Sequence, residues 1–402
     1  MRILYLATWY PYPADNGYKI RVYHLLRALG ARHQVTLLSF SFGTSDPTPK
    51  NELHHFCAEV QAIPVNPFER RQILPGMQFL SLEPVVTRPV PAMHRAVRDT
   101  LARTSFDVAI ASTEVTATYA LQTPGVTAKV LEEHNSLTRW MWERYREQKS
   151  ALQRLRCWVS WQKTRHYEAR LFRKFDLCVM VSEPDRQASM QMLPGYRGPM
   201  EVVPNGVDCQ RNAPGLAQPM PNSLVFNGSL TYHANYDAMR YFLTDIFPLI
   251  KHKVPSVSLK ITGSTSGVNL AGLPLDGNVK LTGYVDDVRP SVASAWVCVV
   301  PIRQGSGTRL KILEAMALGT PVVATAKGAE GLDVTDGEHI LLADEPAAFA
   351  EHTLQLLGDA ALRRRLTANA RRLVEERYDW EQIGQRFVKL VEGAIHRRRE
   401  RL

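Results

Sequence analysis

Glycines and cations gather between positions 301 and 323, where a glycine-rich turn precedes apolar residues at helical spacing. Gly305 and Gly307 would let the backbone approach a ligand closely, and Thr308 is placed to cap the following helix. The free amides and the positive dipole end of a helix attract anions. We therefore predict a diphosphate-binding site made of Arg303, Gly305, Ser306, Gly307, Thr308, Arg309 and Lys311.

Glu314 lies farther along the same predicted helix, where a carboxylate could accept hydrogen bonds from ribose hydroxyls. A simpler interpretation is a tight turn with surface charges, in which Lys311 and Glu314 form an ordinary ion pair along the helix. The turn lacks the third glycine of a dinucleotide-binding fingerprint and the Lys-Ser/Thr ending of a P-loop. On these residues alone, both interpretations stay open.

A second polar cluster follows the strand that we predict over Ala128–Glu132. Residues at the carboxyl ends of parallel strands face ligands, so Glu133 and His134 are our candidate catalytic residues. Histidine titrates near neutral pH, and a carboxylate beside it can orient its ring. The alternative is a capped helix start, with Asn135 or Ser136 as the N-cap.

The elements that must position these residues alternate between short apolar strands and longer amphipathic helices in both halves of the chain. This alternation predicts an α/β fold with two parallel sheets, each covered by helices on both faces. A segment rich in proline and glycine between the halves indicates a linker. The predicted division is a first domain at 1–208, a linker at 209–221, a second domain at 222–377 and a helical segment at 378–402.

The net charge of +10 is concentrated between Arg139 and Lys174, where eleven Lys or Arg accompany only three Glu. The same segment holds four of the seven tryptophans. Its composition is typical of an interfacial element on anionic lipid, and equally of a solvated helix whose tryptophans pack on the domain. We find no nucleic-acid-binding module and predict no nucleic-acid partner.

The cysteines and the first residues bear on the compartment of the protein. The five cysteines are scattered without a CxxC pair, which favours reduced thiols. The apolar start, Arg2–Ala7, is short and is followed at once by Trp9 and Pro11, so it reads as a strand and not as an export signal. No apolar run approaches the roughly 20 residues of a membrane span. We predict a cytoplasmic protein that contacts the inner face of the membrane if segment 139–174 binds lipid.

Six motifs follow one another along almost the whole chain. They are Pro13-Ala14-Asp15-Asn16-Gly17, Glu132-Glu133-His134-Asn135, Val203-Pro204-Asn205-Gly206-Val207-Asp208, Phe226-Asn227-Gly228-Ser229-Leu230, Leu281-Thr282-Gly283-Tyr284-Val285 and the stretch from Gly305 to Val323. These motifs and their order along the chain resemble those of the large retaining glycosyltransferase family 4. The resemblance implies the GT-B fold: two Rossmann-like domains face a central cleft, the first on the acceptor side and the second binding a nucleotide sugar. In this fold the final helix crosses back onto the first domain.

The resemblance also assigns roles by position. Glu314 matches the second glutamate of the family's Glu-x7-Glu motif, which usually holds the donor ribose. Ser306 stands where the first glutamate, a usual contact of the donor sugar, would be. Some branches of the family read Gly-Ser-Gly-Thr-Arg-Leu-Lys here, so the departure looks like a subfamily pattern.

Two further positions follow from the resemblance. Many relatives place an arginine after the residue matching Gly228 and a lysine a few residues on, whereas this chain has Ser229 and neither cation. Arg309 and Lys311 are then expected to neutralise the donor diphosphate. Gly17 would lie on a loop that faces the donor phosphates and the acceptor, although a plain strand–helix turn explains it equally well.

The function implied is transfer of a sugar, with retention, from a nucleotide-diphosphate sugar to a saccharide, lipid-linked or small-molecule acceptor. UDP and GDP are the expected donor nucleotides. We predict no cofactor and no metal, since the family's fold does not generally need one and the chain shows no Asp-x-Asp motif in a suitable loop. The alternatives are a nucleotide-sugar epimerase or hydrolase of the same architecture, and a non-catalytic nucleotide-sugar or membrane-surface binding protein, which Ser306 favours.

Overall fold

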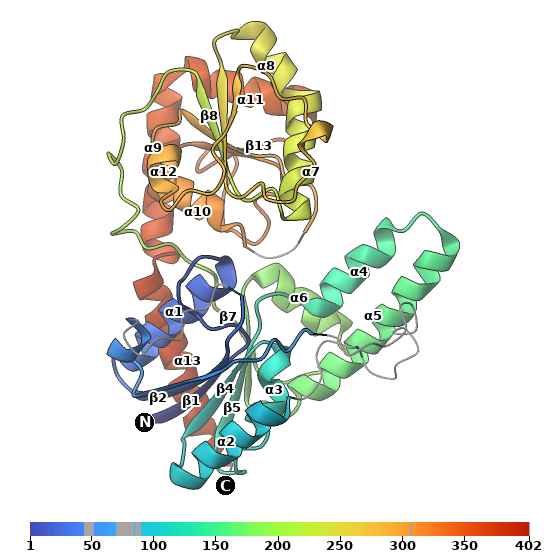
Figure 1. Ribbon diagram of the computed structural model, residues 1–402, viewed down its shortest axis with the longest axis vertical. Helices are drawn as coiled ribbons and strands as arrows, with labels where there is room; N and C mark the ends of the chain where they lie inside the picture. Colours follow the sequence, from blue (N-terminus) through green and yellow to red (C-terminus); the bar gives the residue numbers. More distant parts are fainter. Residues whose placement is uncertain (44–51, 70–83, 85–89, 306–307, 402) are drawn as a thin grey trace. The chain divides into compact units, whose positions relative to one another are not determined.

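A computed structural model of the protein describes residues 1–43, 52–69, 84, 90–305 and 308–401. The chain divides into two compact units, Met1–Pro204 together with Ile383–Leu402, and Asn205–Gln382. Each unit is built on one parallel sheet with helices packed against it (Figure 1). The two sheets predicted from the alternation of strands and helices are thus confirmed.

The first unit contains a seven-stranded sheet in the order β3-β2-β1-β4-β5-β6-β7, and every pair of neighbours is parallel. Its central strands are buried on both faces, as the continuous apolar run Ile3–Leu6 shows. The strands are β1 (Arg2–Ala7), β2 (Gln34–Phe40), β3 (Glu59–Ile63), β4 (Val108–Ser112), β5 (Ala128–Glu132), β6 (Leu177–Met180) and β7 (Met200–Val202).

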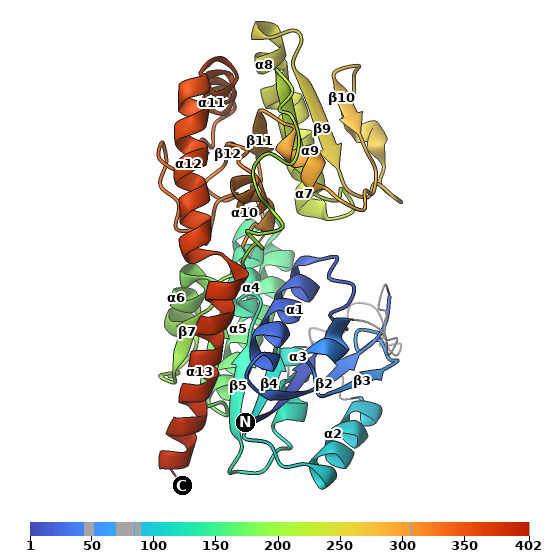
Figure 2. The same cartoon turned by 90° about the vertical axis from the view of Figure 1, so that its left-hand side faces the viewer.

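The last helix of the chain, α13, packs against the first helix, α1, in this unit (Figure 2). The contact is so close that a Cβ on Gly384 would lie 2.5 Å from the Cβ of Ala28. Near its end, the side chain of Arg398 donates to the carbonyl of Gly125 at 2.8 Å. The helices are α1 (Gly17–Gly30), α2 (Pro91–Arg103), α3 (Glu114–Ala120), α4 (Leu137–Glu147), α5 (Ala151–Phe172), α6 (Glu183–Met192) and α13 (Trp380–Glu400), with a short 3-10 turn at Glu52–His55.

The second unit repeats the topology with a six-stranded parallel sheet in the order β10-β9-β8-β11-β12-β13. Numbered along the chain, this is the order 3-2-1-4-5-6 of dinucleotide-binding sheets. The strands are β8 (Ser223–Asn227), β9 (Ser258–Thr262), β10 (Val279–Leu281), β11 (Val297–Val300), β12 (Val322–Ala324) and β13 (Leu341–Leu342).

The helices of the second unit cover this sheet. The first of them continues through a π-helical turn at Phe242–Ile246 into the next. They are α7 (His233–Tyr241), α8 (Phe247–Lys253), α9 (Arg289–Ala293), α10 (Leu310–Ala317), α11 (Pro346–Gly358) and α12 (Ala360–Arg377), with a 3-10 turn at Leu270–Gly272.

The boundary between the units differs from the predicted linker. It falls after Pro204, and the segment 209–221 belongs to the second unit. The guanidinium of Arg371 on α12 holds the start of that segment, because it donates to the carbonyls of Cys209 at 2.9 Å and Asn212 at 2.5 Å. The proline and glycine content that suggested a linker therefore marks an irregular segment attached to one unit.

Candidate functional site

In each sheet the strand order reverses at one point, between β1 and β4 in the first unit and between β8 and β11 in the second. Ligands of doubly wound sheets bind outside the carboxyl ends of the strands at this point. In both units, polar side chains of the predicted site lie after these strands.

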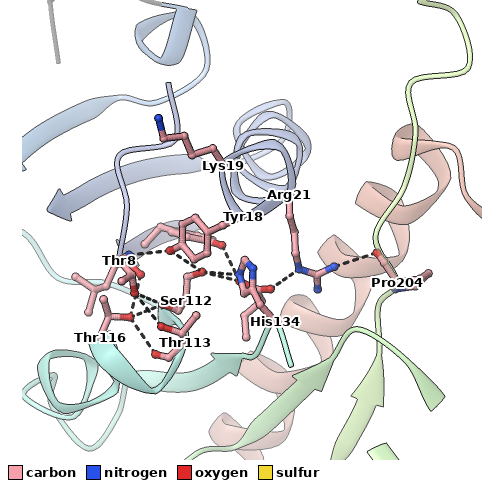
Figure 3. Close-up of polar contacts among 12 residues, drawn as sticks. Thr8, Tyr18, Lys19, Arg21, Ser112, Thr113, Thr116, His134 and Pro204 are labelled. Carbon is pink, nitrogen blue, oxygen red and sulfur yellow. Dashed lines mark hydrogen bonds and ion pairs between the residues drawn. The ribbon is translucent and has the colours of Figure 1, made fainter. Parts of the chain in front are cut away.

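The polar group of the first unit is centred on Glu132, the last residue of β5, which is fully buried. Its Oε1 accepts from Nε of Arg21 at 2.5 Å. Its Oε2 accepts from Oγ of Ser112 at 2.7 Å and lies 3.0 Å from Nε2 of His134. Figure 3 shows how α1, β4 and the segment after β5 bring these side chains together. We call Arg21, Ser112, Glu132 and His134, with Tyr5 and Tyr18, the Glu132 network.

The start of α1 sets the position of two members of this network. Asn16 caps the helix, since its side chain accepts from the backbone N–H of Lys19 at 3.1 Å. Tyr18, in the first turn of this helix, stacks on the His134 ring with 4.3 Å between ring centroids. Its hydroxyl donates to Oγ of Ser112 at 3.1 Å. Predicted Gly17 opens the helix beside this group and is exposed.

The charge of Glu132 is maintained by its partners. Burial alone would raise the pKa of this carboxyl, but His134 and Arg21 outweigh burial and hold the pKa well below its usual range. Arg21 is itself completely buried, and it also donates to the carbonyl of Pro204 at 3.0 Å. The network therefore contains a carboxylate and a guanidinium that neutralise each other inside the protein.

The second predicted catalytic residue, Glu133, lies apart from this network. It is buried in a group with Glu114 of α3 and Glu168 of α5, which we call the acid cluster. Burial, followed by the charges of Glu114 and Glu168, raises its pKa well above the usual value. Burial also raises the pKa of Glu168 to about 8, although this carboxyl accepts from the backbone N–H of Thr138 at 3.1 Å. The predicted pair is thus divided between two environments.

The alternative interpretation of this segment also has support. Ser136 is the N-cap of α4, and its side chain accepts from the backbone N–H of Arg139 at 3.3 Å. The segment after β5 therefore starts a capped helix and also supplies a histidine to a polar network. The two interpretations do not exclude each other.

In the second unit, Lys311 of α10 reaches the point where β8 ends. Its Nζ donates to Oδ1 of Asn235 on α7 at 2.9 Å and lies 3.9 Å from the centroid of the Phe226 ring. Burial lowers its pKa to about 7. Predicted Gly228 leaves room for this approach, because a Cβ there would lie 2.6 Å from the Lys311 Nζ and the lysine would have to move. We call Lys311, Glu314, Asn227 and Asn235 the Lys311 group.

Glu314 is the acidic member of the Lys311 group. Its Oε2 accepts from Nδ2 of Asn227, the last residue of β8, at 2.9 Å. Burial raises its pKa, although Lys311 and Asn227 act in the opposite direction. Lys311 and Glu314 are thus brought to the same strand end, each with a neutral amide as its hydrogen-bond partner.

The remaining predicted residues of the glycine-rich turn take different positions. Gly305 has φ +97°, a conformation that suits glycine, and its carbonyl accepts from Arg309 at 2.7 Å. Arg309 is the N-cap residue of α10, so the expected capping role of Thr308 is wrong. Arg303 forms two 3.1 Å hydrogen bonds with Asp237 of α7. Ser306 and Gly307 lie outside the described residues.

Ser229 sits in the loop after β8, which touches the loop after β9. Its Oγ donates to the carbonyl of Ser264 at 2.9 Å. Gly263, with φ +103°, allows this contact, because a Cβ there would lie 2.6 Å from the Ser229 nitrogen. Ser229 therefore shapes the loop on which Gly228 lies.

Sequence reasoning missed several members of both groups. In the first unit these are Tyr18, Arg21 and Ser112, which are far from His134 in sequence. Alternation of polar and apolar residues could not single them out, since Arg21 looks like an ordinary exposed residue of an amphipathic helix. In the second unit, Asn227 belonged to a quoted motif, but no feature of the sequence marked Asn235 or Asp237.

The segment 139–174 forms a helical hairpin of α4 and α5, which lie side by side in Figure 1 and which we call the basic hairpin. Trp142 of α4 packs on Trp161 of α5 with 4.6 Å between ring centroids. On α5, three large apolar residues stay exposed, Leu152, Leu155 and Trp158. Some tryptophans thus pack within the hairpin, while one joins an exposed apolar stripe.

Across the residues that the structure describes, no helix combines the length and the apolar character needed to cross a bilayer. Within the same residues, no three His, Cys, Asp or Glu side chains gather as a metal site requires.

Known proteins resemble this chain in both halves. Residues 16–211 match the family model described as Glycosyltransferase Family 4, and residues 221–359 match that of Glycosyl transferases group 1. An uncharacterised 44.6 kDa protein of the cps region of Klebsiella pneumoniae is 21% identical over 95% of this chain and 97% of its own length.

Other relatives have assigned activities. The phosphatidyl-myo-inositol mannosyltransferase of Mycobacterium leprae is 32% identical over 47% of this chain, and the match spans about half, 52%, of that enzyme. Among solved structures, sucrose-phosphate synthase of Thermosynechococcus elongatus has a TM-score of 0.70 at 18% identity, covering 98% of this chain and 99% of that one. HepE of Anabaena, in complex with UDP and glucose, has a TM-score of 0.68 at 17% identity, covering 98% and 99%.

Proposed function

We propose that the protein, which has the GT-B fold, is a family 4 glycosyltransferase that moves a sugar, with retention of configuration, from a nucleotide-diphosphate sugar to a saccharide, lipid-linked or small-molecule acceptor. The predicted GT-B fold and transferase class are confirmed. The family matches favour transfer over the epimerase, hydrolase and non-catalytic alternatives.

The Lys311 group is the observation that carries this proposal. A cation and a carboxyl lie together at the strand end where doubly wound sheets bind nucleotides. We assign Lys311 and Arg309 to the donor diphosphate and Glu314 to the donor ribose. The other proposed donor contacts are Gly17, Gly228, Ser229, Arg303, Gly305, Ser306, Gly307 and Thr308.

Two similar proteins support our choice of donor nucleotides. HepE was crystallised with UDP-glucose, and a similar enzyme of Corynebacterium glutamicum is named as GDP-mannose-dependent. UDP and GDP are therefore the donor nucleotides that we propose for this chain. Protein cations would neutralise the phosphates, and we propose neither a metal nor a cofactor for the transfer.

The proposed reaction needs no protein nucleophile. The bond between the anomeric carbon and the diphosphate oxygen breaks, and a bond from that carbon to the acceptor oxygen forms on the same face. The proton of the acceptor hydroxyl passes to the departing diphosphate. The protein would act by stabilising the diphosphate charge with cations and amides and by holding the two substrates together. Of the two predicted catalytic residues we keep His134 as a substrate contact, because Glu133 is buried in the acid cluster.

The basic hairpin supports a second part of the proposal. Its exposed Leu152, Leu155 and Trp158 lie among the arginines of α5, which is the composition of an interfacial helix. We propose that the hairpin contacts the anionic inner face of the membrane, where a lipid-linked acceptor would be found. Sedimentation with phosphatidylglycerol vesicles should decrease for W158S and should be absent with phosphatidylcholine vesicles. Equal binding of W158S and wild type would contradict the proposed contact.

A thermal-shift screen tests the donor site directly. UDP, GDP, ADP, CMP, dTDP and their common sugars are added to wild type and to the double variant R309A/K311A. A nucleotide at about 100 times its Kd should stabilise the wild type by about 2.7 kcal/mol, and the double variant should lose this shift.

The matched control is K251A, which removes a lysine that is paired with Asp276 on the surface of the same unit. It should keep the full nucleotide shift. The absence of a shift with every nucleotide on the wild type would count against the proposed donor site.

A further inference from the structure

The Glu132 network fixes more than the position of His134. Four donors converge on the Glu132 carboxylate: Nε of Arg21 at 2.5 Å, Oγ of Ser112 at 2.7 Å, Nε2 of His134 at 3.0 Å and the hydroxyl of Tyr5 at 3.3 Å. A carboxylate only accepts hydrogen bonds. The nitrogen of His134 that faces it must therefore be a donor.

Ser112 agrees with this assignment. Its Oγ donates its one proton to Glu132 and accepts from the Tyr18 hydroxyl. Since that proton is already used, Oγ must also be the acceptor in its 3.1 Å contact with His134. Nε2 of His134 thus faces two acceptors. A lone pair on Nε2 would be directed at the carboxylate, which is electrostatically unfavourable, so Nε2 carries a proton in both the neutral and the charged imidazole.

We infer that Glu132 is a positioning residue that holds His134 as the Nε2–H tautomer and leaves Nδ1 to accept a hydrogen bond from a hydroxyl of a sugar ligand. The tautomer follows from the network alone, while the ligand hydroxyl rests on the proposed function. Among the described residues, Nδ1 shows no hydrogen-bond partner, and the side chain is 16% exposed. Stacking on Tyr18 fixes the plane of the ring.

Arg21 makes this arrangement stable. Glu132 has no exposed side-chain surface, and a buried carboxylate without a cation would take up a proton instead. A protonated Glu132 could donate to Nε2, and the tautomer would no longer be fixed. The charged and titratable groups around His134 are Glu132 on β5, Arg21 and Tyr18 on α1, Tyr5 on β1 and Glu114 on α3.

Nitrogen NMR of histidine-labelled protein tests the tautomer without any substrate. The protein has 12 histidines, and H134Q identifies the resonances of His134 by their loss. In the wild type we expect a protonated Nε2 and an unprotonated Nδ1 in the neutral ring. S112A, which leaves Glu132 in place, should keep this state. An Nδ1–H tautomer in the wild type would overturn the inference.

E132Q gives the sharpest contrast. Because Arg21 is a donor, the amide oxygen should face Arg21, and the amide NH2 group should then donate to Nε2 of His134. We therefore expect His134 to change to the Nδ1–H tautomer. The double variant E132L/R21M removes both charges and covers the case in which E132Q does not fold. It should show a mixture of tautomers, and exclusive Nε2–H in both variants would show that Glu132 does not fix the ring.

Turnover provides the functional readout. In the hydrolysis of UDP-glucose or GDP-mannose, water takes the place of the acceptor hydroxyl and nucleoside diphosphate is released. The kcat of this reaction should fall about 10- to 100-fold for E132Q, while the Kd of UDP or GDP should stay within about twofold. Unchanged kcat beside an inverted tautomer would disprove the role of Nδ1. If neither nucleotide binds the wild type, the proposed donor site fails, but the NMR result still decides the assignment of Glu132.

Discussion

The Glu132 network and the Lys311 group occupy equivalent ends of equivalent sheets, yet they treat charge in opposite ways. In the first, Glu132 is paired with a buried guanidinium, and its pKa lies well below the usual range. In the second, Lys311 and Glu314 are held by the neutral amides of Asn235 and Asn227. Burial lowers the pKa of Lys311 to about 7 and raises that of Glu314.

The charges of the Glu132 network are thus compensated within the protein, whereas the charge of Lys311 in the Lys311 group has no anionic hydrogen-bond partner among the described residues. The protein itself compensates the Glu132 carboxylate, so the network is complete without a ligand. The ammonium of Lys311 pays a desolvation cost that the amide of Asn235 offsets only in part. An anionic ligand would supply the missing partner, as the proposed diphosphate does.

The largest effect should come from breaking the compensated pair. R21M leaves Glu132 buried without its cation and should reduce the free energy of unfolding by about 3–5 kcal/mol in urea denaturation. R103M, which removes an exposed partner of Glu59, is the control and should change stability little. A loss below about 1 kcal/mol for R21M would contradict the view that the pair is strongly coupled.

The Lys311 group should respond to pH. Without a ligand, the ammonium of Lys311 has a pKa of about 7. Binding of UDP or GDP above this pH therefore requires the uptake of a proton by Lys311. The affinity should then decrease with a slope that approaches about tenfold per pH unit. Calorimetry from about pH 6 to pH 9 measures this slope. K311M should bind more weakly at low pH and show a flat profile. An equal slope in wild type and K311M would assign the titration to another group.

The acid cluster offers a third environment to compare. Since the pKa of Glu168 is raised to about 8, the folded state holds a proton that the unfolded state releases near the usual carboxyl pKa. The stability that this proton contributes is therefore fully present below the pKa of Glu168 in the unfolded state. It is lost as pH rises toward about 8, by at most about 1.4 kcal/mol per pH unit. E168Q, an analogue of the protonated form, should make thermal stability fall less steeply between about pH 5 and pH 8, while the raised pKa of Glu133 still contributes to the slope. If its profile matches the wild type, Glu168 is not the titrating group.

The smallest effect concerns the approach of Lys311 to the backbone. A Cβ at position 228 would lie 2.6 Å from Nζ, so G228A should displace the lysine and weaken nucleotide binding by about tenfold. The flexible side chain can move, so the thermal midpoint should change little. G277A in the same unit is the control, because a Cβ there meets nothing within 4 Å. Equal affinity in both variants would show that the close approach is not needed for binding.

The fold was largely accessible from the sequence because local patterns determine it. The apolar run of Val297–Val300 becomes a strand buried on both faces, as its composition indicates. The domain boundary was less accessible. The irregular segment 209–221 looks like a linker in sequence, but contacts of Arg371, a residue far along the chain, attach it to the second unit.

The site was predictable only where it is local. Lys311 and Glu314 lie on one helix, and their spacing predicts that they reach the same place. His134 was identified from its position after a strand. Its partner Arg21 was not, because a hydrogen bond across 111 residues leaves no periodic signal. Burial of Glu133 depends likewise on α3 and α5, which pack above it only in the folded protein.

The burial of Arg21 and Glu132 has a consequence for how this sequence can change over generations. Loss of either residue alone leaves the charge of the other buried without its partner. Replacement of both residues by apolar ones of similar volume removes both charges at once. Single substitutions at these two positions should therefore be rare among homologous sequences. The two positions should instead vary together, so that a lineage without the carboxylate also lacks the arginine.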